Sequence, residues 1–167
     1  MFELKRLSPE GIGSALAKAE RYRLLNEPWD AESICLDILA LEPENQEALV
    51  TLLLAITDQF KMARGKRRVG DAMELIPRLD GDYRQAYYTG IIWERRATKI
   101  LQRGDPGSGT VAYEDLRKAM DHYEQAERVR PAGDDSAIIR WNSCARIIDR
   151  HDHVKPPSED EPEPMLE

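Results

Sequence analysis

Residues 38–43 of the chain are Ile-Leu-Ala-Leu-Glu-Pro, and similar phrases return as Ala-Met-Glu-Leu-Ile-Pro at 72–77 and Ala-Glu-Arg-Val-Arg-Pro at 126–131. In each phrase an apolar pattern with helical spacing stops at or just before a proline, which cannot continue an α-helix. Pro43 and Pro77 are 34 positions apart. Three helices that end alike, two of them at this spacing, indicate repeated helical units.

Small and large side chains recur at matching positions before these prolines. The first unit has Ala19, Tyr22, Ala31 and Cys35, the second Leu53, Ile56, Gly65, Val69 and Ala72, and the third Gly90, Trp93, Ala119, Tyr123 and Ala126. Over roughly residues 10–150 this series resembles the tetratricopeptide repeat, whose units follow W-x2-L-G-x2-Y, A-x3-F and P. The resemblance implies an all-α fold, a superhelix of antiparallel helix hairpins whose stacked neighbours share one core.

The expected repeat domain covers residues 1–150, with units at about 12–45, 46–79 and 83–133 and a capping helix at 136–150. Two departures from the family pattern stand out. Leu53 occupies a position where a small residue is usual, and the third unit carries 17 extra residues between Gly90 and Ala119. The insertion includes the loop-forming Gly-Asp-Pro-Gly-Ser-Gly at 104–109, which predicts long helices at 83–102 and 111–130. Gly90 is expected where these two helices cross closely.

In the family, the first helix of each unit lines a concave groove that binds segments of other proteins. An apolar or amphipathic segment would suit the expected groove, whose centre is apolar with arginines and carboxylates around it. The alternative is that its residues pack on each other or against the chain's own tail. A family subset grips carboxyl termini with Lys and Asn where this chain has Leu16 and Glu20, so that ligand is not expected. The candidate groove residues are Leu16, Glu20, Arg23, Val50, Leu54, Asp58, Tyr87, Ile91, Arg95, Ile138, Asn142 and Arg146.

The charge distribution argues against nucleic acid as a ligand. The 167 residues carry a net charge of −7, of which −5 comes from the proline-rich tail at 151–167, where six acidic residues face one lysine. Phosphate binding needs clustered positive charge, which a nearly neutral body does not supply. The tail is predicted to be disordered. No segment is long enough to span a membrane and the first residues lack a secretory signal pattern, which predicts a cytoplasmic protein.

A basic cluster lies at the turn of the second unit. It comprises Lys61, Arg64, Lys66, Arg67 and Arg68. The favoured interpretation is a solvated turn. The alternatives are a patch for an acidic partner, for the acidic tail or for nucleic acid, and the absence of interleaved aromatic residues weakens the last.

Candidate catalytic and metal-binding residues do not converge in the sequence. Cys35 and Cys144 occupy apolar positions and are expected to be buried. His151 and His153 fall at a fraying helix end, and the glycines at 104–109 lack the Lys-Ser/Thr of a phosphate loop. We therefore expect no catalytic residue, no metal and no cofactor.

The sequence predicts a non-enzymatic protein-binding module, an adaptor that holds a peptide or helix of another protein in its groove. The alternative is a structural module that self-associates into a homo-oligomer, because residues 1–9 give little cover to the first repeat. An enzyme is the least favoured hypothesis.

Overall fold

The chain forms seven α-helices and three short 310-helices in the part that the structure describes, residues 2–61 and 69–157, and no strand occurs there. The structure is a computed structural model. The expected all-α class is confirmed. The α-helices are α1 (Ile12–Leu24), α2 (Pro28–Leu41), α3 (Gln46–Asp58), α4 (Val69–Met73), α5 (Asp82–Arg103), α6 (Ser108–Arg128) and α7 (Ser136–Arg150), and the 310-helices are η1 (Pro9–Gly11), η2 (Gln59–Lys61) and η3 (Ile76–Arg78).

Prolines and a capping asparagine mark the ends of several helices. Helix α2 opens with Pro28 and ends two residues before Pro43. The Asn45 side chain caps α3 by accepting a hydrogen bond from the Ala48 N–H at 2.9 Å. Pro77 differs from the other two prolines because it lies inside η3 rather than after a helix.

The two long helices occur as expected, but the loop between them is shorter. Gly104 and Gly107 both have positive φ, 65° and 77°. These two left-handed positions allow residues 104–107 to complete the turn between α5 and α6. Ser108 and Gly109 therefore belong to α6, which begins three residues before the expected start at 111. In the second unit α4 has only five residues, and the expected Gly65 and basic residues 64–68 lie outside the described part.

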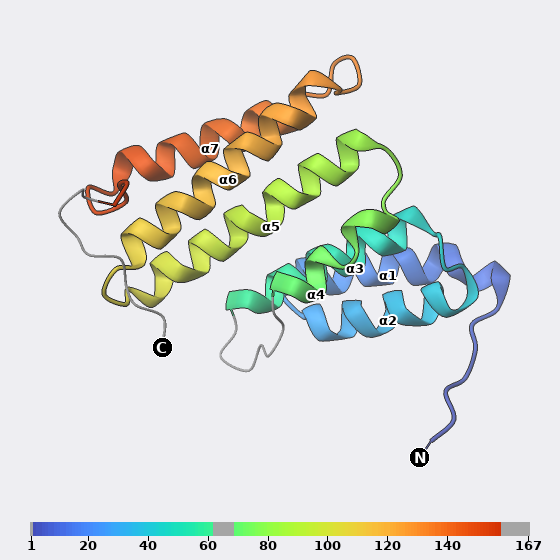
Figure 1. The fold of residues 1–167 in the computed structure, drawn as a ribbon. Coiled ribbons are helices and arrows are strands. Elements are labelled where there is room, and N and C mark those ends of the chain that lie inside the picture. Colours follow the sequence, from blue (N-terminus) through green and yellow to red (C-terminus); the bar gives the residue numbers. More distant parts are fainter. Residues whose placement is uncertain (1, 62–68, 158–167) are drawn as a thin grey trace.

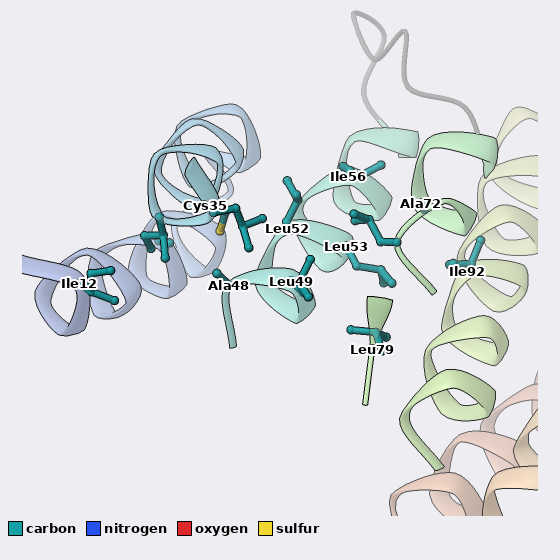
Figure 2. Close-up of a cluster of buried hydrophobic side chains, with 14 of the residues drawn as sticks. Ile12, Cys35, Ala48, Leu49, Leu52, Leu53, Ile56, Ala72, Leu79 and Ile92 are labelled. Carbon is teal, nitrogen blue, oxygen red and sulfur yellow. The ribbon is translucent and has the colours of Figure 1, made fainter. Parts of the chain in front are cut away.

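Consecutive helices pack as neighbours, in the order α1, α2, α3 and then α5, α6, α7 (Figure 1). Among the alternate helices, α3 also touches both α1 and α5. Helix α5 lies between two hydrophobic cores. Its Ile92 belongs to the core of the first four helices, whereas Ile91 belongs to the core formed with α6 and α7. In Figure 2 the α3 leucines lie between Cys35 of α2 and the pair of Ala72 and Ile92.

The segment after α7 docks onto the start of α6, which corrects the tail boundary expected at residue 150. Val154 is 3% exposed and its N–H donates to the His151 carbonyl at 2.8 Å. The backbone of His153 lies directly over Gly109. Residues 151–154 are thus part of the folded body, because Val154 of this polar stretch packs into the core formed with α6 and α7. The rest of the expected disordered tail, from 158, lies outside the described residues.

Candidate protein-binding groove

A groove of about 390 Å³ runs between α1, α3 and α5. The first turns of the three helices meet at one end of it, and their later turns meet at the other. The helices therefore run in the same direction and share one face of the molecule. The groove is lined by Gly13, Leu16, Ala17 and Glu20 of α1, by Gln46, Glu47, Val50 and Thr51 of α3, and by Arg84 and Tyr88 of α5.

The floor of the groove is apolar and only partly covered. Leu16 and Val50 are half-buried and pack against the first core, and Tyr88 contacts both cores from α5. Gly13 and Ala17 have no bulk to fill the space above α1, which keeps the hollow open. Half-buried apolar side chains beside open space are what a binding groove offers to an incoming side chain.

Gln46 fixes the open end of the groove, at the start of α3. Its side chain donates to the Arg78 carbonyl at 3.1 Å and accepts from the Asp80 N–H at 2.8 Å. These bonds tie α3 to the turn before α5. A second hollow continues the groove at this end and is lined by Leu16, Asn45, Gln46, Glu47, Asp80 and Arg84.

An ion network connects the three helices at the other end. Arg23 Nε donates to Asp58 Oδ2 at 2.8 Å, and Arg95 Nη1 donates to Asp58 Oδ1 and, at 2.7 Å, to Thr57 Oγ1. Burial lowers the pKa of the Arg95 guanidinium, and its partner Asp58 opposes that shift. One carboxylate thus holds two arginines, and the network carries an excess positive charge.

The structure separates the twelve predicted groove residues into four groups. Leu16, Glu20 and Val50 line the groove. Arg23, Asp58 and Arg95 come together at its far end, where they pair with one another. Leu54 is half-buried against both cores. The remaining five residues, on α5 and α7, do not line it: Tyr87, Ile91, Ile138, Asn142 and Arg146.

The predicted face of α5 is wrong at Ile91, which is 2% exposed and belongs to the core with α6 and α7. Tyr87 also packs against that core, with its ring centroid 5.9 Å from that of Tyr123. An i, i+4, i+8 series drifts by about 40° per step around a helix, so it does not follow one face. Arg84 and Tyr88, which sequence reasoning missed, are the α5 side chains on the groove.

The predicted face of α7 is also displaced. Arg140 of α7 reaches α5, where its Nη1 donates to Glu94 Oε1 at 3.2 Å. Ile138 and Asn142 are each two residues from Arg140, which places them about 200° around the helix from it. The phrase that ends at Pro131 marks where the preceding helix stops, but it does not fix the rotation of α7 about its own axis.

Chemically reactive groups lie away from the groove. Cys35 and Cys144 are fully buried, as expected. The rings of His151 and His153 are 5.8 Å apart, and no cluster of three or more metal-binding side chains occurs among the described residues. Within residues 2–61 and 69–157, no helix is long and apolar enough to cross a bilayer.

Comparisons with protein-family models, with curated proteins and with solved structures give no significant match. The groove is therefore the basis on which a function can be argued.

Proposed function

We propose that the chain is a non-enzymatic, cytoplasmic adaptor of the tetratricopeptide type, which binds a peptide segment of another protein in the groove between α1, α3 and α5. The observation that carries the proposal is the alignment of three parallel helices along an open, partly apolar trough. The repeated sequence phrases supply the link to the family, and they predict that alternate helices share one surface.

The geometry supports binding without large rearrangement. Gln46 fixes one end of the trough and the Asp58 network fixes the other. A surface whose walls are already held in place loses little conformational entropy on binding. Tyr88 is the kind of large, rigid side chain that contributes most to such contacts.

Selection of peptides from a random displayed library against the purified protein tests the proposal. Binding of the selected peptides is then compared between the wild type, Val50→Arg in the groove and Val111→Arg on α6. Val111 is a 40% exposed valine outside the groove, so it is a matched control. We expect Val50→Arg to weaken binding at least about tenfold, about 1.4 kcal/mol, and Val111→Arg to leave it unchanged. Equal binding by Val50→Arg and wild type would rule out the groove.

Self-association is the second candidate, and exposed apolar side chains near the N-terminus support it. Trp29 and Leu36 of α2 are 44% and 50% exposed, and Leu36 borders a hollow of about 190 Å³ against residues 4–7. Burying such a patch between two copies would remove apolar surface from water. Light scattering over a range of concentrations tests this, since the mass should rise with concentration and fall to that of a monomer in Leu36→Glu.

A further inference from the structure

The groove carries carboxylates that nothing in the described chain neutralises. Glu20 projects from α1 and Glu47 from α3, and both are exposed on its lining. Neither side chain makes a hydrogen bond or ion pair with another described residue. This separates them from Asp58, which is held by two arginines. Placing acidic side chains on both walls of one trough leaves a local negative potential there.

The lining of the groove has little positive charge to balance them. Asp80 adds a third carboxylate in the adjoining hollow, and Arg84 is the one cation among the described lining residues. Arg84 is itself directed to the Gln46 side chain, with Nη1 3.5 Å from Oε1. Three carboxylates against one guanidinium give the groove and its adjoining hollow, taken together, an excess of two negative charges.

The opposite end has the reverse sign. Arg23 is one helical turn beyond Glu20 on α1, and with Arg95 it surrounds the single carboxylate of Asp58. A cationic group is therefore attracted toward the carboxylates of the groove lining and repelled from the network of Arg23, Asp58 and Arg95. Between the two ends, Leu16, Val50 and Tyr88 provide the apolar contact.

From these features we propose that the occupant of the groove is a basic amphipathic segment of another protein. It places a lysine or arginine between Glu20 and Glu47 and an apolar side chain on the floor beside Val50. This inference rests on the proposed function and adds the chemistry of the partner. Charge complementarity of this kind mainly selects the partner and speeds the encounter, while the apolar contact holds the segment.

Three labelled peptides test the proposal. Each peptide has twelve residues and the same helical pattern of leucines. The peptides differ only in carrying lysine, glutamate or glutamine at the other positions. Fluorescence anisotropy gives Kd for each peptide with the wild type, with Glu20→Lys/Glu47→Lys and with Val50→Arg. The matched control is Glu114→Lys/Glu127→Lys, two exposed glutamates on α6, which changes the net charge by the same amount.

We expect the lysine peptide to bind the wild type at least about tenfold more tightly than the glutamate peptide. The groove double variant should bind the lysine peptide about tenfold more weakly than the wild type does, and the glutamate peptide more tightly. The α6 double variant should keep the wild-type preference for the lysine peptide. The lysine peptide's affinity should also fall when salt is raised to about 0.5 M, since exposed charges are then screened.

The outcomes separate this inference from the proposed function. If the glutamate or glutamine peptide binds best and Val50→Arg abolishes its binding, the groove binds peptides but its basic preference is wrong. An equal loss in both double variants would mean that total charge and not the groove sets the preference, which also overturns the inference. If no peptide binds, or if Val50→Arg binds the lysine peptide like the wild type, the inference fails together with the proposed function.

Discussion

Gly90 of α5 lies flat against the ring of Tyr123 of α6. A Cβ atom added at Gly90 would be 2.5 Å from Tyr123 Cε1 and 2.7 Å from Cδ1. The ring has little room to retreat, because Tyr123 is 1% exposed and its hydroxyl donates to Glu94 Oε2 at 2.5 Å. The close crossing expected at Gly90 from the sequence is confirmed, and it brings two long helices into contact.

Gly90→Ala should destabilise the fold although alanine favours helix. The added methyl group overpacks the crossing by about 1–3 kcal/mol, which exceeds the gain of about 1 kcal/mol in helix propensity. Gly13→Ala is the control, because nothing lies within 4 Å of a Cβ at that helical glycine. Urea denaturation of the two variants should show a loss of stability for Gly90→Ala and none for Gly13→Ala. A Gly90→Ala variant as stable as Gly13→Ala would contradict the crossing.

Asp58→Ala should destabilise the chain by about 1–3 kcal/mol, because it leaves Arg23 and the largely buried Arg95 without their shared acceptor. Arg23→Ala should cost less than about 1 kcal/mol, since Asp58 keeps its bond to Arg95. The control is Asp121→Ala, which removes an exposed pair with Arg117 at 3.8 Å and should change stability by less than about 0.5 kcal/mol. Urea midpoints for the three variants give the comparison. A loss in Asp58→Ala no larger than in Asp121→Ala would show that the network does not connect the helices.

The parts of the groove that the sequence predicted are those controlled by local pattern. Leu16 and Val50 fall at the same position of successive units, and each lies on a helix whose buried face is plain from its apolar spacing. Helix α5 is different because it has a core on both sides, so its adjacent Ile91 and Ile92 are both buried. Periodicity cannot show which of two buried faces borders the groove, so the family pattern points to Tyr87 and misses Tyr88.

The sequence indicates even less clearly that residues 151–154 dock on the folded body. Val154 stands among charged, histidine and proline residues, a composition typical of a disordered tail. Only the surface of α6 decides that it is buried, and that surface depends on Gly109, which in the sequence belongs to a loop-forming run. Helix ends were easier to predict, because Pro43 and Pro131 act through the backbone alone.

The thiols of Cys35 and Cys144 should be inert in the native protein. Burial raises the pKa of each to about 12, so the reactive thiolate is almost absent at pH 8. Unfolding returns both to about 8.5. The folded state therefore holds protons that the unfolded state loses, and stability should decline as pH rises from about 8.5 toward 12. Reaction with a chromogenic disulfide at pH 8 should be slow without denaturant and fast in concentrated urea. Rapid labelling of both thiols in the native state would contradict their burial.

Gly109→Ala should release the segment that follows α7. The new methyl group would meet the carbonyl oxygen of His153 and lie 2.8 Å from its carbonyl carbon, both of them backbone atoms that cannot rotate away. The segment must then lift, and the loss of Val154 burial costs about 1.5–3 kcal/mol. A chain that ends at Arg150 provides the decisive background. Without residues 151–167 nothing occupies the space above Gly109, so the substitution should cost nothing there and gain slightly in helix propensity. Urea denaturation of the four proteins gives this interaction as a double-mutant cycle. An equal cost of Gly109→Ala in both backgrounds would show that the His153 backbone does not rest on α6.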